Sequence, residues 1–242
     1  LCYIGTVLRT KPMTLGGSRE LLQIGAELFG DDSIAADKQI IDAMLATLDL
    51  TFADTQDAVT LSLSHVDIFS ALIDAMQISE QQAAQIYDAL LRKSAPDIKQ
   101  LDDNADNDLS VFVALSKSRG KQDVLQEFVE HSAVKAIMND SNECAARINA
   151  AIAAIAELSE HIAQYSNDSS AIDLHIDLAE LHGYRYHTGL TFQAFIKGEG
   201  RAIAKGGRYH GFSGSNSAEN DKPRAATGFS ADLKLLASVS KA

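Results

Sequence analysis

Residues 21–29 read LLQIGAELF, and residues 1–8 read LCYIGTVL. Both runs are rich in branched and aromatic side chains, a composition that favours β-strands. Residues 11–18, which separate them, contain one proline and two glycines, and these residue types favour turns. We therefore predict a β-hairpin at the beginning of the chain.

Beyond the hairpin, helical and strand patterns alternate. Apolar residues recur at helical spacing from Ala35 to Leu48, which predicts a helix packed on the hairpin. Residues 59–64 alternate apolar and polar side chains, the pattern of a half-buried strand. Residues 67–76 predict a second helix.

Residues 79–166 lack strand patterns and contain repeated helix start signals. Ser79 with Gln82 resembles a capping box, while Asp108 and Ser141 are candidate N-caps. The acidic residues 102–108 lack the glycine and glutamate of a calcium loop, so we read them as a solvated loop before a helix. We predict a block of helices, the last from about 142 to 164.

Strand patterns return after this block, in residues 171–178, 189–196, 201–204 and 225–229. Gly206 and Gly207 predict a tight backbone bend. Residues 211–224 predict a polar loop, and 231–237 a final helix.

Strands, a helical insertion and further strands without a βαβ repeat predict an α+β fold around an antiparallel sheet. We place the first part of the core at 1–78, the insertion at 79–166 and the second part of the core at 167–242. The chain opens without Met on a strand pattern, so we expect a preceding segment to be missing.

The chain has 242 residues, of which 46% are hydrophobic, and 21 basic residues against 33 acidic ones give a net charge of −12. That charge repels phosphate backbones and disfavours nucleic-acid binding. Cys2 and Cys144 form no metal-type spacing and no disulfide framework, which favours a reducing cytoplasm. The longest apolar run is too short to cross a bilayer.

Motif searches exclude several kinds of site. The glycine-rich segments fit neither the dinucleotide nor the Walker pattern, and no Gly-x-Ser-x-Gly elbow is present. His175, His182, His187 and His210 lie in the last third of the chain without a recognised metal-ligand spacing. We therefore predict no metal site and no cofactor.

Two polar residues interrupt the apolar strand at 21–29. Gln23 and Glu27 are four residues apart, so in a strand they share one face. Burying them without partners would cost several kcal/mol. With Arg9 on the preceding strand, they would suit a zwitterion such as an amino acid. An internal Arg9–Glu27 salt bridge is an equally open alternative.

Several ordered motifs resemble those of class II histidyl-tRNA synthetases. Residues 3–9 with 23–30 resemble motif 2, and residues 226–230 occupy the place of motif 3. Residues 181–192 and 206–211 resemble the two histidine-binding signatures. The resemblance covers about 1–76 and 171–238. It implies a class II synthetase-like antiparallel sheet flanked by helices, with residues 79–166 as the variable helical insertion.

The departures from the synthetase pattern concern catalysis. His182 replaces an arginine that assists amino-acid activation, and Leu235 replaces the arginine that grips ATP. The loop at 11–18 is shorter than the basic loop expected to reach ATP and tRNA. The closer resemblance is to the regulatory subunits of ATP phosphoribosyltransferase, carried by residues 15–20, 23–28, 186–189 and 226–234.

This resemblance implies a non-catalytic subunit in the first step of histidine biosynthesis. It implies a hetero-octamer with the short catalytic phosphoribosyltransferase, which the subunit activates, and feedback inhibition by histidine as an allosteric effector. It also implies self-association as a dimer, through a class II strand and helix in the missing N-terminal part, and no tRNA or membrane partner.

The family's site residues carry over by motif position. Glu27 and Gln23 correspond to groups that meet the α-amino or imidazole part of histidine, and Arg9 to a group that meets its carboxylate. The expected effector-binding residues are Arg9, Gln23, Glu27, His182, Tyr186, His187 and Tyr209. Arg19 faces either this pocket or the catalytic partner. The alternatives are a truncated or divergent histidyl-tRNA synthetase, and a structural activator that no longer binds histidine.

Overall fold

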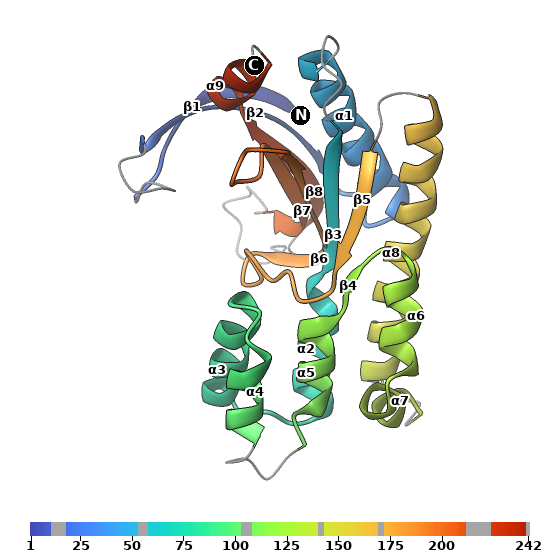
Figure 1. Cartoon of the computed structure of the whole chain (residues 1–242). Helices are drawn as coiled ribbons and strands as arrows, with labels where there is room; N and C mark the ends of the chain where they lie inside the picture. Colours follow the sequence, from blue (N-terminus) through green and yellow to red (C-terminus); the bar gives the residue numbers. More distant parts are fainter. Residues whose placement is uncertain are drawn as a thin grey trace, which may run out of the picture. The chain divides into compact units, whose positions relative to one another are not determined.

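The computed structural model describes residues 1–10, 18–52, 58–102, 108–139, 143–168, 172–211 and 224–240 (Figure 1). These residues form eight strands and nine helices, and the strands make a mixed sheet in the order β1-β2-β8-β7-β6-β3-β5-β4. The chain divides into two compact units, 1–61 with 164–173 and 192–242, and 62–163 with 174–191. The predicted α+β class is confirmed.

The first unit is built on four neighbouring strands and two helices: β1 (Cys2–Leu8), β2 (Glu20–Phe29), β7 (Ala204–Gly211), β8 (Arg224–Asp232), α1 (Ile34–Phe52) and α9 (Leu233–Val239). β1 pairs with β2, β2 with β8 and β7 with β8, all antiparallel. Figure 1 shows β1 and β2 as a curved ribbon with α9 beside it. The predicted hairpin strands are confirmed, and most of their turn, 11–17, lies outside the described residues.

Helix α1 packs on β2, β7 and β8 through its apolar stripe. The stripe residues Ile40, Ile41, Met44, Leu45 and Leu48 are all buried. Arg208 of β7 fastens the same helix, because its Nη2 donates to Oδ2 of Asp37 at 2.8 Å and to the carbonyl of Ser33 at 2.8 Å. Arg208 therefore points to the α1 side of the sheet.

The bend predicted at Gly206 and Gly207 is wrong, because both residues lie inside β7. The missing side chain at Gly206 has a packing reason. A Cβ there would lie 2.5 Å from the ring of Phe192 and 2.2 Å from the carbonyl oxygen of Gly228. Gly206 therefore lets the neighbouring strand and a ring approach closely.

Three strands and one helix contribute residues to both units: β3 (Val59–His65), β5 (Ile172–Asp177), β6 (His187–Ile196) and α8 (Glu143–Asp168). The strand predicted at 59–64 is confirmed, but its half-buried character is wrong. Ser62 and Ser64 are both buried, 9% and 1% exposed, like Leu61 and Leu63 beside them. The reason is position, since β3 lies inside the sheet between β6 and β5.

The second unit is mainly helical: α2 (Val66–Ala75), α3 (Glu80–Leu91), α4 (Ala95–Asp102), α5 (Ser110–Lys117), α6 (Asp123–Glu130), α7 (Ser132–Met138) and most of α8. Ser79 caps α3 by accepting from the Gln82 amide, as predicted. Asp108 accepts from the Ser110 amide at 2.9 Å. Ser141 and the acidic residues 103–107 lie outside the described residues. One short strand, β4 (Arg119–Gly120), interrupts the predicted run of helices and pairs with β5.

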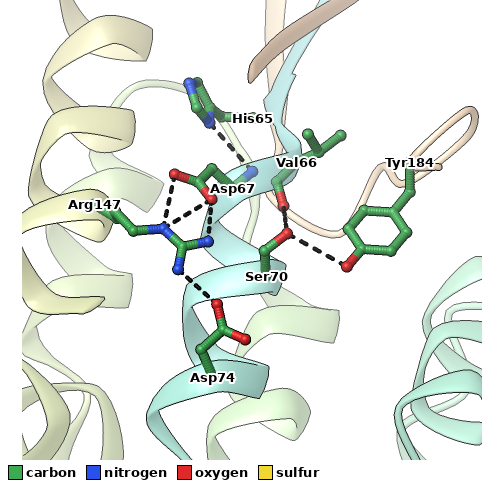
Figure 2. A network of polar contacts seen from close by, with 7 residues as sticks. All are labelled: His65, Val66, Asp67, Ser70, Asp74, Arg147 and Tyr184. Atoms are coloured by element: carbon green, nitrogen blue, oxygen red, sulfur yellow. Dashed lines mark hydrogen bonds and ion pairs between the residues drawn. The ribbon is translucent and has the colours of Figure 1, made fainter. Parts of the chain in front are cut away.

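An ion-pair network joins α8 to α2 within this unit (Figure 2). The guanidinium of Arg147 donates through Nε to both oxygens of Asp67 and through Nη1 to Oδ2 of Asp74 at 2.6 Å. Its side chain is 28% exposed, so the pair with Asp67 is largely withdrawn from solvent. The hydrogen bond to Asp67 is the largest cause that raises the pKa of Arg147. The network therefore ties the longest helix to α2.

No helix in the described parts of the chain is both long enough and apolar enough to cross a membrane.

Candidate functional site

Gln23 and Glu27 project from the same face of β2, as their spacing predicts. Opposed residues of paired strands project to one face. The register places Tyr3 of β1 opposite Gly25, and Gly228 of β8 opposite Glu27. We name as the site face the surface formed by Tyr3, Gln23, Glu27, Lys205 and Tyr209.

The carboxylate of Glu27 is held by Tyr209, 182 residues further along the chain. The Tyr209 hydroxyl donates to Oε2 of Glu27 at 2.8 Å. The Tyr209 ring packs edge-on against Phe29, with centroids 6.4 Å apart. A Cβ at Gly228 would lie 1.7 Å from the same Oε2, so only glycine leaves room for this arrangement.

Glu27 is set up to accept a further hydrogen bond. Partial burial raises the pKa of its carboxyl, and the hydrogen bond from Tyr209 opposes that shift. Within the described residues, the Tyr209 hydroxyl is the one side-chain donor to this carboxylate. A half-buried carboxylate with spare acceptor capacity suits an ammonium or an imidazolium ligand group.

Gln23 is paired with Tyr3 on the neighbouring strand. Its Nε2 donates to the Tyr3 hydroxyl at 2.7 Å. A Cβ at Gly25 would lie 2.6 Å from that hydroxyl oxygen, so this glycine clears the space under the ring. Burial raises the pKa of Tyr3, and the Gln23 hydrogen bond opposes the change. The Gln23 carbonyl oxygen and the Tyr3 hydroxyl therefore present polar atoms beside Glu27.

Arg9 does not pair with Glu27. The Arg9 amide donates to the carbonyl of Arg19, whereas the Glu27 amide donates to the carbonyl of Leu1. Arg19, the backbone partner of Arg9, precedes the first residue of β2 and is eight residues before Glu27 in the chain. The internal salt bridge considered from the sequence is therefore not formed.

Arg19 has a local contact at the far end of the same hairpin. Its Nε donates to the Arg9 carbonyl at 2.8 Å. The side chain thus fastens the ends of β1 and β2 to each other where the ladder ends. This contact does not distinguish the two predicted roles of Arg19, in the effector pocket or against the catalytic partner.

The other expected residues, His182, Tyr186 and His187, belong to the second unit. His182 pairs through Nδ1 with the carboxylate of Glu180, and its side chain is 70% exposed. Burial alone would raise the pKa of Glu180, but the hydrogen bonds from His182 hold it below the usual value. His182 thus has an acidic partner, which an effector would have to share.

Tyr186 and His187 are consecutive in the chain, and their side-chain rings contact each other. Their rings meet edge-on with centroids 5.2 Å apart. Gly183 has a φ of 79°, and a Cβ on it would lie 2.9 Å from Cδ2 of His187. The His187 ring therefore packs over Gly183. His182, Tyr186 and His187 thus form a cluster in the second unit, whereas the site face belongs to the first unit.

Three residues of this arrangement were missed by sequence reasoning: Tyr3, Lys205 and Gly228. The bend expected at 206–207 would have ended the strand, so there was no reason in the sequence to place Lys205 beside Tyr209. A continuous strand would have placed Lys205 and Tyr209, four residues apart, on one face. Gly228 carried no signal of its own, because its role depends on the strand opposite.

The sequence of this chain is similar to a known protein family. The family model described as Histidyl-tRNA synthetase matches residues 1–236. The chain belongs to the histidyl-tRNA synthetase family. This membership confirms the resemblance inferred from the motifs, and the match includes the strands that carry the site face.

Curated relatives within the histidyl-tRNA synthetase family have a regulatory name. The protein named ATP phosphoribosyltransferase regulatory subunit from Pseudomonas entomophila (strain L48) is 38% identical over 100% of this chain and 57% of its own length. The chain thus spans little more than half the length of the curated relatives it matches.

Two solved structures of low sequence identity share the fold. An ATP phosphoribosyltransferase regulatory subunit/histidyl-tRNA synthetase from Bacillus halodurans C matches with a TM-score of 0.75 and 22% identity, over 98% of this chain and 57% of that one. The ATP phosphoribosyl transferase (HisG:HisZ) complex from Thermotoga maritima matches with a TM-score of 0.68 and 17% identity, over 96% and 72%. The predicted class II synthetase-like fold is confirmed.

Proposed function

We propose that this chain is the synthetase-like part of a regulatory subunit of ATP phosphoribosyltransferase, and that free histidine binds at its site face. The observation that carries the proposal is the half-buried Glu27 carboxylate, held by Tyr209 over Gly228 with acceptor capacity to spare. The name of the curated relatives, at 38% identity over the whole chain, supports the regulatory role.

Histidine carries the charges that this face can satisfy. Its ammonium or imidazole group donates to Glu27, and the amide of Gln23 lies beside it on the same strand face. Tyr209 forms one wall of the site. His182, Tyr186 and His187 stay predicted effector contacts on the family motifs alone. Arg9 meets the carboxylate, and Arg19 contacts either the ligand or the partner.

The subunit itself is non-catalytic in this proposal. Leu235, at the place of the arginine that would grip ATP, is buried in α9 with 5% of its surface exposed. A buried aliphatic side chain offers no charge to a triphosphate. His182, at the place of the activating arginine, is engaged with Glu180. These two positions favour a sensor over an aminoacylating enzyme.

The regulated activity resides in the short catalytic phosphoribosyltransferase, with which the chain assembles in the cytoplasm. The assembly is a hetero-octamer, and the synthetase-like chains associate as dimers within it. Histidine inhibits by binding the inhibited assembly more tightly than the active one, with a coupling of typically 1–3 kcal/mol. No cofactor, metal or tRNA takes part.

Two measurements test this proposal. Isothermal titration of the chain with histidine, with Glu27→Ala as the comparison, should show binding that the variant loses. Co-purification with the short phosphoribosyltransferase, followed by an activity assay with and without histidine, should show activation and feedback inhibition. An absence of histidine binding together with retained activation would indicate a structural activator.

The competing function is that of a truncated or divergent histidyl-tRNA synthetase, an enzyme of the family to which the chain belongs. Such an enzyme would catalyse histidine-dependent exchange between ATP and pyrophosphate. Robust exchange would replace the regulatory proposal with this one. We expect none above background.

A further inference from the structure

The loop between β5 and β6, residues 178–186, carries two of the expected effector contacts, His182 and Tyr186. Both residues are exposed. In contrast, Leu178, Ala179 and Leu181 at the beginning of the loop are fully buried. The positions of the exposed side chains therefore depend on what holds the backbone of this loop.

Lys93, directly after α3, holds the beginning of the loop. Its Nζ donates to Oδ1 of Asp177 at 2.9 Å and to the carbonyl oxygen of Ala179 at 2.8 Å. The same Oδ1 accepts from the Ala179 amide at 3.1 Å. The Lys93 and Asp177 side chains are 24% and 12% exposed, so the pair is largely withdrawn from solvent. Lys93 thus fastens the last residue of β5 and the second residue of the loop to the end of α3.

The backbone of Lys93 lies in the left-handed region, with a φ of 53°. Its amide donates to the carbonyl of Leu90, and the amide of Ser94 donates to the carbonyl of Ala89. Glycine is the usual residue at this position of a helix end, because a side chain is strained there. Lysine is therefore unfavourable for the helix end itself, and what it adds is the contact with the loop.

Aromatic side chains of α2 and α3 hold the loop further along. The Tyr87 hydroxyl of α3 donates to the Leu181 carbonyl at 3.4 Å. The Tyr184 ring packs edge-on against Phe69 of α2, with centroids 5.1 Å apart, and lies 5.7 Å from the Tyr87 ring. Figure 2 shows Ser70 of α2 facing Tyr184, whose hydroxyl accepts from Ser70 Oγ at 3.3 Å. The loop is thus attached to these helices at its beginning and again near its end.

We propose that Lys93 and Tyr87 are positioning residues, which set the places of His182 and Tyr186 for an effector and couple its binding to the end of α3. Both positioning side chains bond to backbone carbonyls of the loop, so they fix the chain from which the two exposed side chains project. Coupling is reciprocal, so a ligand that orders the loop also orders the end of α3. This inference rests on the proposed function for its ligand, histidine.

The test measures amide hydrogen exchange in the whole chain, with and without histidine, and titrates histidine by calorimetry. The reporters in the loop are the amides of Tyr184 and Tyr186, which donate to the carbonyls of Leu181 and Gly183. Lys93→Gly removes the lysine side chain and leaves a residue suited to the left-handed backbone. Lys93→Arg retains a cation.

Two further variants separate the lysine from its surroundings. Tyr87→Phe removes one hydroxyl and keeps the ring. Arg92→Met is the matched control, because it removes the neighbouring cation, which pairs with the exposed Asp97. Urea unfolding checks that every variant is folded and gives its midpoint.

We expect Lys93→Gly to speed exchange of the loop amides and to weaken histidine binding, each about tenfold, the usual effect of losing a hydrogen bond from a charged group. Tyr87→Phe should cause smaller changes in the same direction, whereas Lys93→Arg and Arg92→Met should change neither. In wild type, histidine should slow exchange of the Ser94 amide, and Lys93→Gly should lose this protection. A merely structural contact would lower the urea midpoint and speed exchange throughout the second unit.

Other outcomes overturn the inference. If loop exchange in Lys93→Gly equals that of wild type, or rises no more than exchange elsewhere in the second unit, Lys93 does not position the loop. If the loop exchanges faster but histidine binds Lys93→Gly as tightly as wild type, the coupling is wrong while the proposed function stands. If wild type binds no histidine, the proposed function is wrong and the coupling with it, and loop exchange in Lys93→Gly still decides the positioning.

Discussion

The hydroxyl of Tyr209 donates to Oε2 of Glu27 at 2.8 Å, although the two residues are 182 positions apart in the chain. Tyr209 belongs to β7 and Glu27 to β2, and β8 lies between these strands. The bond therefore crosses a whole strand, at the position where Gly228 lacks a side chain. It gives the most direct test of the site.

Replacing Tyr209 with phenylalanine should weaken histidine binding by up to about tenfold, since the variant loses one hydrogen bond to a charged group. The ring contact with Phe29 would remain, so we expect the free energy of unfolding to change by less than about 1 kcal/mol. Calorimetric titration and urea unfolding measure the two effects. Unchanged affinity would remove Glu27 and Tyr209 from the binding site.

Glu27→Gln should stabilise the chain at neutral pH while abolishing histidine binding. The pKa of Glu27 is raised above its usual value of 4.5, so the folded chain binds this proton more tightly than the unfolded chain. Stability is therefore lost as pH rises from about that value through the raised folded pKa. The variant's melting temperature should exceed that of wild type more at pH 7 than at pH 4. A gain that is equal at both pH values would contradict the argument.

Gly228→Ala should displace the Glu27 carboxylate, because the added Cβ would lie 1.7 Å from Oε2. We expect lost histidine binding and a destabilisation of about 1–3 kcal/mol, typical of overpacking. Gly5→Ala is the matched control, since a Cβ at Gly5 meets nothing within 4 Å. Equal effects of the two substitutions in titration and urea unfolding would contradict a specific role for Gly228.

Arg208→Met should cost about 3–5 kcal/mol of folding free energy, because it leaves the Asp37 carboxylate buried without its partner. The Asp37 side chain is 7% exposed, and that of Arg208 is 13% exposed. The double variant Arg208→Met/Asp37→Leu should recover part of the loss, since no uncompensated charge remains. Urea unfolding of the three variants gives the coupling energy, and additive losses would exclude a direct pair.

Arg147→Met should destabilise the second unit by about 1–3 kcal/mol, because Asp67 and Asp74 then face each other without the guanidinium. The exposed pair of Arg92 and Asp97 provides the control. Arg92→Met should cost less than about 1 kcal/mol, as surface pairs do. Chemical denaturation of both variants makes the comparison, and equal costs would show that the network in Figure 2 is no more than a surface contact.

The sequence alone determined the local elements and the family. Strand composition in residues 1–8 and 21–29 and the apolar stripe of α1 are properties of neighbouring residues, and the structure confirms the elements that they predict. The ordered motifs likewise identified the histidyl-tRNA synthetase family without any knowledge of contacts. The shared face of Gln23 and Glu27 followed from the two-residue period of a strand.

Only the tertiary structure decided how distant residues combine. Hydrogen-bond register between strands places Gly228 under Glu27, puts Lys205 in a row with Tyr3 and separates Arg9 from Glu27. The same pairing keeps Gly206 and Gly207 in a continuous strand where local propensity favoured a bend. Register depends on strands from opposite ends of the chain, so residue type and spacing within any one strand do not contain it.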